Sequence, residues 1–196
     1  MINNAQALKD SKKGFTLLEL LIVIAILAIL ATVVVLVLNP AEYLKQARDT
    51  QRTNDMNTLS NALNLVLTNA TSTVFTTNYT YCTATTSAGQ ANTEFSAGGT
   101  FPACTGTNVQ TGTAINGTGW VPVDFTKLSG GSPLAKLPID PQGFAYFFAA
   151  SSANQTYRLA AKLESSKYAS LLTSDGGANP NFFEVGTDLT STAAPF

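Results

Sequence analysis

The longest hydrophobic stretch of the chain, Phe15–Leu38, contains a single carboxylate, Glu19. As a helix it would rise about 36 Å, enough to cross a bilayer. Basic residues precede this stretch and no matching cluster follows directly, which predicts a cytoplasmic N-terminus. The basic residues are Lys9, Lys12 and Lys13. The pattern therefore predicts one membrane-spanning helix, and a plain signal anchor is the simplest protein that would carry it.

Asn39-Pro40 interrupts this pattern, because proline lacks a backbone donor and disfavours helix at the residue before it. Helix-forming residues resume at Ala41 and continue to about Leu67. The second half of this segment carries an apolar stripe at spacings of three and four, which predicts one helix face ready to pack. The stripe consists of Met56, Leu59, Leu63 and Val66.

The first half of this second helix is rich in charge. Opposite charges recur at helical spacing, which predicts ion pairs along its own surface. The expected pairs are Glu42–Lys45, Arg52–Asp55 and Lys45–Asp49.

The remainder of the chain reads as a sheet. "TVFTTNYTYCTA" alternates and predicts a strand or an extended loop, and clearer strands are expected at Phe144–Ala150 and Thr156–Leu163. Phe182–Val185 is a candidate edge strand. We therefore expect an α+β fold, in which a small antiparallel sheet packs on the striped helix.

Composition excludes several classes of function. Charged residues make up 12% of the chain and the net charge is −1, so no basic field is available for direct nucleic-acid contact. Histidine is absent, which removes the commonest general base and metal ligand. No nucleophile motif or phosphate-binding loop is present, and we expect no enzymatic activity.

The chain contains two cysteines, Cys82 and Cys104. Their spacing fits neither a CxxC motif nor a zinc site. A bridge between them would close a loop of about 23 residues and contribute on the order of 3 kcal/mol in the chain-entropy model. We expect this disulfide, which would suit an extracytoplasmic setting.

The segment "KKGFTLLELLIVIAILAILA" resembles the N-terminal prepilin signal of type IV pilins and type II secretion pseudopilins. The resemblance implies cleavage after Gly14 by a membrane-embedded prepilin peptidase and N-methylation of Phe15. "LPIDPQGFAYFF" is similar to the turn and strand of many members of the family.

The same resemblance divides the chain into four parts. Residues 1–14 would be the leader, and residues 15–38 the membrane and filament-core helix. Residues 39–68 would continue the helix, and residues 69–196 would form the head with its antiparallel sheet.

The resemblance implies a role for Glu19. An acid at the centre of a membrane helix costs about 2.5–3.5 kcal/mol on insertion scales, and less near an end. In the family, the equivalent acid pairs with the N-terminal amine of a neighbouring subunit, here that of Phe15. The alternative is an acid that reaches the membrane interface or is protonated.

Two further features have two interpretations each. Asn39-Pro40 is either a point where the helix melts in the filament or a plain kink. Asp175, Asn179 and Asp188 lie where related pseudopilins bind calcium, but their spacing is irregular, and a solvated turn cluster is the favoured reading. We expect no other cofactor.

These features predict a major or abundant subunit of a type IV pilus, used for adhesion, motility or DNA uptake. It would lie in membrane lipid with its N-terminus in the cytoplasm, and an assembly platform with a cytoplasmic ATPase would add it to a surface homopolymer. The alternative is a pseudopilin of a type II secretion filament. The long polar segment between helix and final sheet favours the pilus.

Overall fold

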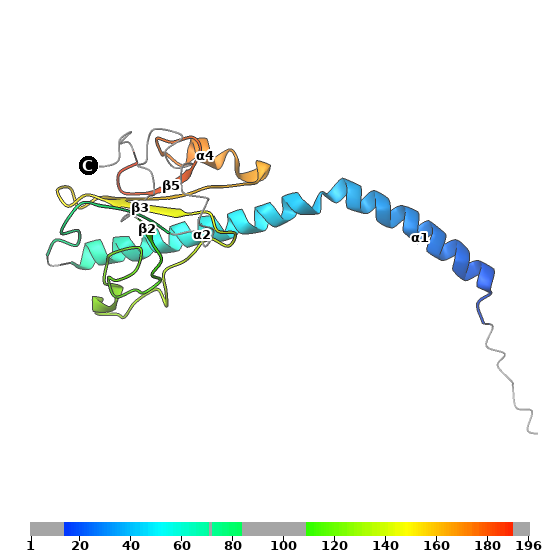
Figure 1. The fold of residues 1–196 in the computed structure, drawn as a ribbon, viewed down its shortest axis with the longest axis horizontal. Coiled ribbons are helices and arrows are strands. Elements are labelled where there is room, and N and C mark those ends of the chain that lie inside the picture. The colour runs from blue at the N-terminus through cyan, green and yellow to red at the C-terminus, as the bar shows by residue number, and fades with distance from the viewer. Residues whose placement is uncertain (1–13, 71, 84–108, 190–196) are drawn as a thin grey trace, which may run out of the picture. The chain divides into compact units, whose positions relative to one another are not determined.

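A computed structural model describes residues 14–70, 72–83 and 109–189 of the chain (Figure 1). The chain divides into two compact units, Met1–Ala41 and Glu42–Phe196. The first unit contains helix α1 (Leu17–Leu38). The second contains nearly all of helix α2 (Pro40–Asn69) together with the sheet.

Among the described residues, five strands form one sheet in the order β2-β1-β3-β4-β5. β1 pairs in parallel with β2, and the other neighbours are antiparallel. The α+β prediction is therefore confirmed, while the short β2 was not foreseen. The strands are β1 Tyr79–Thr83, β2 Val109–Gln110, β3 Tyr146–Ala150, β4 Tyr157–Ala161 and β5 Phe183–Gly186.

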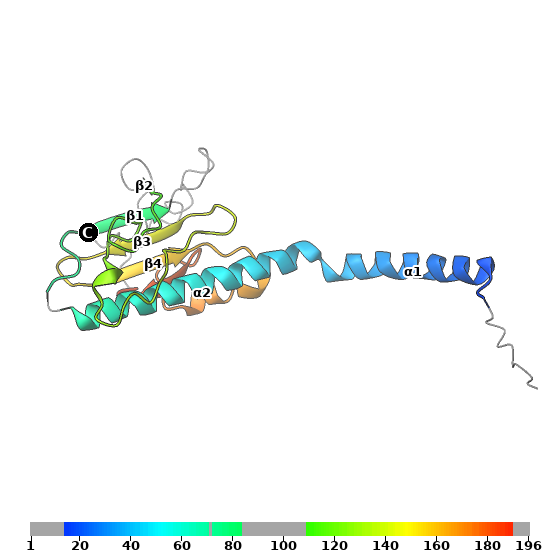
Figure 2. The same ribbon diagram turned by 90° about the horizontal axis from the view of Figure 1, so that it is seen from below.

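Helix α2 runs along the sheet, as both views show (Figures 1 and 2). The stripe residues Met56, Leu59 and Leu63 are fully buried and form one hydrophobic cluster with side chains of β3 and β4. Full burial of a side chain of this kind contributes about 1.5–3 kcal/mol, so the stripe fixes the sheet against α2.

The central strands are buried on both faces, which explains their nearly continuous apolar sequence. Tyr146 and Phe148 of β3 belong to the cluster that contains the α2 stripe. Phe147 and Ala149, which alternate with them, belong to a second cluster that includes Phe182. Alternate residues of a strand point to opposite faces, so β3 contributes to two cores.

Irregular segments complete the second unit. One of them, between β2 and β3, buries Trp120, whose indole Nε1 donates to the carbonyl oxygen of Pro138 at 3.0 Å. This bond holds the turn that precedes β3. The short helices, which the sequence patterns did not predict, are η2 Phe125–Lys127, η3 Ser166–Tyr168 and α4 Leu171–Ser174.

Candidate functional site

The N-terminal end of α1 is closed by a capping box between Thr16 and Glu19. Glu19 Oε2 accepts from the Thr16 N–H at 2.8 Å and from the Thr16 hydroxyl at 2.9 Å. In return, Thr16 Oγ1 accepts from the Glu19 N–H at 3.2 Å. This reciprocal arrangement satisfies donors that a helix start leaves open, and it explains why the helix begins at Leu17 rather than at Phe15.

The other carboxylate oxygen of Glu19, Oε1, accepts no hydrogen bond from any residue that the structure describes. The capping box directs the side chain back toward the N-terminus, as helical side chains generally point. A negative charge in the first turn is also favoured by the helix dipole. Glu19 therefore offers one oriented acceptor at the start of an apolar helix.

Gly14 and Phe15 lie outside the helix, and Phe15 is 92% exposed. A Cβ atom placed on Gly14 would meet no atom within 4 Å. The fold of this chain therefore does not itself require glycine there, and any such requirement would come from a bound peptidase.

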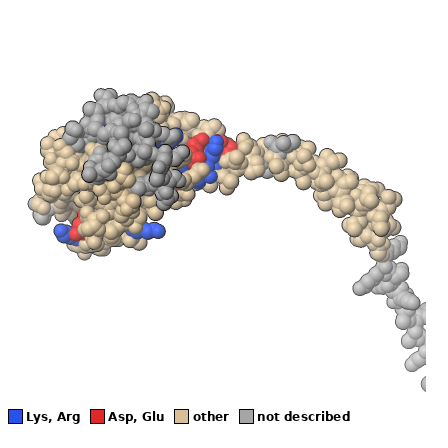
Figure 3. Space-filling model, viewed as in Figure 1, with Lys and Arg blue, Asp and Glu red and all other residues tan. Residues whose placement is uncertain are grey.

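Helix α1 exposes apolar side chains on every side. The window Leu17–Val35 has a mean hydropathy of 3.1, and none of it is buried. By length and composition it is the one helix of the described residues able to cross a membrane. On the face shown in Figure 3, charged side chains gather over the first turns of α2, while the α1 surface is uncharged. A helix that is apolar all round needs lipid or other helices about it.

The junction between α1 and α2 lies at Asn39. Its backbone has φ 41° and ψ 73°, the left-handed conformation that asparagine tolerates better than most residues. Pro40 then begins α2, at the first helical position that proline favours. The structure places the interruption where the sequence pattern expects it. Neither of the two interpretations, melting point or plain kink, is tested.

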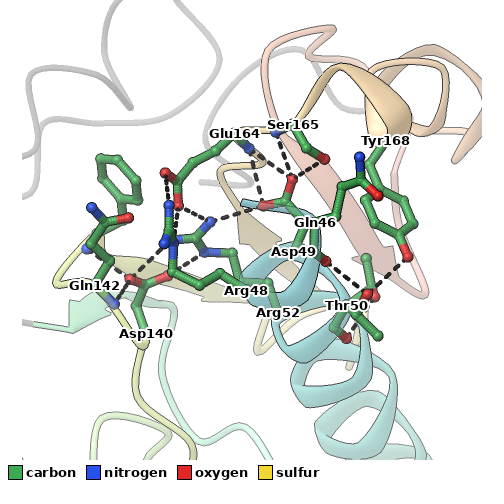
Figure 4. A network of polar contacts seen from close by, with 12 residues as sticks. Gln46, Arg48, Asp49, Thr50, Arg52, Asp140, Gln142, Glu164, Ser165 and Tyr168 are labelled. Atoms are coloured by element: carbon green, nitrogen blue, oxygen red, sulfur yellow. Dashed lines mark hydrogen bonds and ion pairs between the residues drawn. The ribbon is translucent and has the colours of Figure 1, made fainter. Parts of the chain in front are cut away.

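The first turns of α2 hold the head through a buried polar clamp (Figure 4). Arg52 is fully buried. Its Nε lies 2.6 Å from Asp140 Oδ2 and its Nη1 lies 2.8 Å from Asp49 Oδ1. Arg52 also pairs with Glu164, which receives a second arginine, Arg48, at 2.8 Å. One guanidinium thus joins α2 to the turn before β3 and to the segment after β4.

Asp49 binds the segment after β4 through backbone donors. Its carboxylate accepts from the Glu164 N–H at 3.0 Å, the Ser165 N–H at 2.7 Å and the Ser165 hydroxyl at 2.6 Å. Two turns earlier, Glu42 accepts from the N–H and hydroxyl of Ser166 at 2.7 and 2.8 Å. Thr50 and Tyr168 add a hydroxyl pair at 2.9 Å.

The clamp shifts the pKa values of its members. Burial alone would lower the pKa of Arg52, but hydrogen bonds and charge from Asp140, Glu164 and Asp49 raise it. Burial would raise the pKa of Glu164, yet its bonds to Arg48 and Arg52 hold it below the usual value. Such a network is costly to break, because removing one partner leaves a buried charge unpaired.

The predicted surface pairs along α2 are therefore wrong in part. Arg52 pairs with Asp49 and with distant carboxylates, not with Asp55. Asp55 instead accepts from the Tyr146 hydroxyl at 2.8 Å, and burial raises its pKa. Ion pairs with tertiary partners contribute more to stability here, because these partners are shielded from water and held in place. An ion pair on an exposed helix surface contributes little to stability.

The calcium candidates Asp175 and Asp188 lie around a buried ion pair between Arg158 and Glu184. Asp175 Oδ1 and Oδ2 accept from the Gly177 N–H at 2.8 Å and the Glu184 N–H at 2.7 Å. Arg158 lies 3.4 Å from Glu184 Oε1 and donates to the carbonyl oxygen of Asp188 at 3.1 Å. The guanidinium is thus a cation already beside this loop.

The third candidate, Asn179, is buried in the same loop. Its Oδ1 accepts from the Asn181 N–H at 3.0 Å. Within the described ranges, no group of three His, Cys, Asp or Glu residues is placed to hold a metal ion.

Cys82 is buried in β1 and disulfide-bonded. Its predicted partner, Cys104, lies outside the described residues. The pairing between the two therefore stays a prediction.

Comparison with known proteins identifies the N-terminal segment. Residues 9–35 match the family model of the prokaryotic N-terminal methylation motif. This motif is the class III signal of type IV pilins and pseudopilins, and the match supports a pilin-like or pseudopilin-like protein without distinguishing between the two. No curated protein and no solved structure matches the chain.

The motif carries three general consequences. It points to a structural protein, to processing by a prepilin peptidase, and to assembly into filaments. The apolar helix agrees with membrane anchoring before assembly.

Two sets of residues at these sites escaped the sequence patterns. Thr16 carries a readable signal, since Thr-x-x-Glu before an apolar run is a capping-box sequence. The distant partners of Arg52, Asp140 and Glu164, have no such signal. They lie 88 and 112 residues further along the chain, and only the fold brings them together.

Proposed function

We propose that this chain is a major or abundant structural subunit of a type IV pilus. The observation that carries the proposal is the N-terminal methylation motif together with a helix whose apolar window Leu17–Val35 is not buried by the described residues. That surface suits lipid before assembly and a core of parallel helices afterwards.

Moving α1 from lipid to a helical core brings no hydrophobic gain, because lipid tails are as apolar as leucine side chains. Close packing and polar pairs must therefore select the arrangement of subunits. Glu19 is the only charged residue of α1, so it is the group best suited to set the axial register.

Cleavage after Gly14 would create a charged amine at Phe15. Glu19 Oε2 is held by Thr16, whereas Oε1 remains available for the amine of a neighbouring subunit. The pair would neutralise two charges that lipid or a helical core disfavours. The capping box would hold the acceptor in place before the neighbour arrives.

A pseudopilin of a type II secretion filament is the second candidate, since the same signal serves both classes. The long polar segment between α2 and β3 supports the pilus, because major pseudopilins tend to be shorter chains. Adhesion, motility and DNA uptake are the uses that such a filament would serve.

Intact-mass spectrometry of filaments sheared from the cell surface tests the proposal. The expected mass begins at N-methylated Phe15 and increases by two hydrogens after thiol reduction, as a Cys82–Cys104 bridge requires. Protein that stays in the membrane fraction with residues 1–14 attached would overturn the filament role.

Deletion of the gene separates the two filament classes. A pilus subunit should be required for surface filaments and dispensable for secretion of folded exoproteins. Loss of secretion with surface filaments intact would instead assign the chain to a secretion pseudopilus.

A further inference from the structure

A groove of about 570 Å³ lies at the C-terminal end of α2, within the range of volumes common for ligand sites. Three separate segments form it: the last turn of α2, residues 72–76, and the segment from residue 116 to residue 129. Both ribbon views place the green segment that contains η2 beside the last turns of α2 (Figures 1 and 2).

The wall formed by residues 72–76 is held by one side chain. Gln155 Oε1 accepts from the N–H groups of Val74 and Phe75 at 2.8 and 3.1 Å. Its Nε2 donates to the Phe75 carbonyl oxygen at 2.9 Å. Gln155 itself has φ 52°, an uncommon conformation for a residue that is not glycine, and these bonds offset its cost.

The opposite wall is fixed by two side chains that bond to their own segment. Asn116 Oδ1 accepts from the N–H and hydroxyl of Thr118 at 3.3 and 2.7 Å. Asp124 Oδ1 accepts from the N–H of Thr126 at 3.0 Å, which caps η2. An isolated antiparallel bridge joins Asn116 to Asp124. Both walls are therefore formed before any ligand arrives, which lowers the entropic cost of binding.

Some of the hydroxyl and amide groups around the groove have no hydrogen-bond partner among the described residues, whereas Asn69, Thr76 and Tyr79 are already bonded. The hydroxyls of Ser72, Thr73 and Ser129 make no hydrogen bond in the described part of the chain, and neither does the Nδ2 group of Asn116. Each hydroxyl can donate or accept a hydrogen bond, and the Asn116 Nδ2 group can donate. The apolar surface between them comes from aliphatic side chains and one aromatic ring, contributed by Val66, Val74, Pro122, Val123, Leu128 and Tyr79.

The charges of the groove cancel. Lys127 Nζ lies 3.6 Å from Asp124 Oδ2, and these are the two charged residues among the described lining. An anion would be repelled by Asp124 and a cation by Lys127. The groove thus offers neutral hydrogen-bonding groups around a partly apolar surface with an aromatic side chain.

A saccharide presents the matching chemistry, since its hydroxyls donate and accept at the edges while its C–H groups form apolar faces. We propose that this groove binds a neutral saccharide. The proposal concerns the head alone and holds whether the chain builds a pilus or a secretion pseudopilus.

The test uses the full processed chain in a zwitterionic detergent that lacks a sugar headgroup. Lactose, N-acetyllactosamine, maltose and N,N′-diacetylchitobiose are the neutral probes, and sialyllactose is the charged counterpart. Saturation-transfer NMR should show binding of at least one neutral probe, with Kd on the order of 1 mM and no gain from the sialic acid.

Two variants and a control locate the site. Ser129→Trp should fill the groove and abolish the signal, whereas Thr111→Trp, at an exposed position outside it, should preserve the signal. Asp124→Asn keeps the acceptor that caps η2 but leaves the charge of Lys127 unbalanced, so it should strengthen the binding of sialyllactose and leave that of the neutral probes unchanged. Thermal melts establish whether each variant is folded. If Ser129→Trp does not fold, the result for Asp124→Asn decides whether the groove is the binding site.

Three results would overturn the proposal. The first is that no neutral probe binds at about 10 mM. The second is equal loss of binding in the Ser129 and Thr111 variants, or binding of sialyllactose by the parent chain that is tighter than its binding of the neutral probes. The third is loss of filaments in Ser129→Trp with no saccharide bound by the parent chain, which would make the groove a contact between subunits.

Discussion

Helices α1 and α2 place charge and apolar surface in opposite ways. In α1, apolar side chains are exposed, and the single acid, Glu19, forms a capping box with Thr16 at the start of the same helix. In the first turns of α2, charged side chains are buried and paired with residues more than 80 positions away. Each arrangement would be unfavourable without its partners.

The difference lies in where those partners are. The partners of Arg52 are in the same chain, so its network is complete in one molecule. None of the described residues buries the apolar window Leu17–Val35 of α1, and none of them donates to the second oxygen of Glu19. A change at α2 should therefore alter the stability of the head, and a change at α1 should alter assembly.

The largest effect is expected for Glu19→Gln. Glutamine retains an acceptor for the Thr16 donors, so the capping box stays, but the negative charge is lost. We expect normal cleavage after Gly14 and at least a tenfold fall in filament yield, about the effect of one charge-assisted hydrogen bond. Immunoblots of sheared filaments and of membranes measure both.

Thr16→Val is the matched control. It removes the cap, which costs about 1 kcal/mol of helix stability, and it preserves the charge of Glu19. Filaments should persist in this variant. Normal filaments from Glu19→Gln, or equal losses in the two variants, would contradict a pairing role for the charge.

The second effect is expected at the clamp. Arg52→Met leaves the carboxylates of Asp49, Asp140 and Glu164 without their shared cation. The free energy of unfolding should fall by about 3–5 kcal/mol, which corresponds to about 10 °C in the melting temperature of a head of this size. Circular dichroism of the full chain in detergent measures it.

Arg48→Met provides the comparison, since the Arg48 side chain is a quarter exposed and Glu164 is its one ion-pair partner among the described residues. Its melting temperature should fall by much less. Equal shifts for the two arginines would show that burial and the number of partners do not set the strength of the clamp.

The predictability of the two regions from sequence differs for the same reason. The start of α1 depends on neighbours three residues apart, so "TLLE" already contains the information for its cap. The stripe of α2 likewise follows helical spacing, and Met56, Leu59 and Leu63 are buried as predicted. Local periodicity is sufficient wherever the interaction is local or averaged over a face.

Buried ion pairs do not follow local spacing. Arg52 and Asp55 have the spacing of a surface pair, yet each finds a distant partner. The groove at the end of α2 also escapes prediction, because its three walls come from segments that meet only when the sheet forms. Sequence reasoning thus reached the elements and the N-terminal signal, but not contacts that depend on tertiary packing.

The third prediction concerns pH. Bonds to Arg48 and Arg52 outweigh burial and lower the pKa of Glu164, so its contribution to stability is present above about pH 4.5 and is lost as the pH falls through the folded-state pKa. The pKa of Glu42 is also lowered, through its hydrogen bonds from Ser166, so its contribution to stability is likewise lost in acid. Asp55 and Glu184 have raised pKa values, so their effect on stability changes with pH in the opposite direction.

Because these groups oppose one another, the wild-type curve alone does not isolate Glu164. Denaturant unfolding of wild type and Glu164→Gln between neutral pH and about pH 3 does. Their stability difference should be largest near neutrality and shrink in acid. A difference that does not change with pH would show that the carboxylate charge contributes nothing to the clamp.

The smallest effect is expected from calcium. Asp175 already accepts two backbone donors, and Arg158 supplies a cation beside Glu184 and Asp188. Added calcium or a chelator should therefore move the melting temperature by less than about 1 °C, since a ligand stabilises the fold only as far as it binds it. Arg158→Gln, by contrast, should lower the melting temperature by several degrees, because Glu184 would remain buried beside a neutral group. A rise of several degrees on adding calcium to the wild type would mean that the loop rearranges to bind the ion. Calcium would then displace the guanidinium of Arg158 from the loop. The head would in that case depend on an outside partner at this loop, as α1 does, and the contrast between the two regions would fail there.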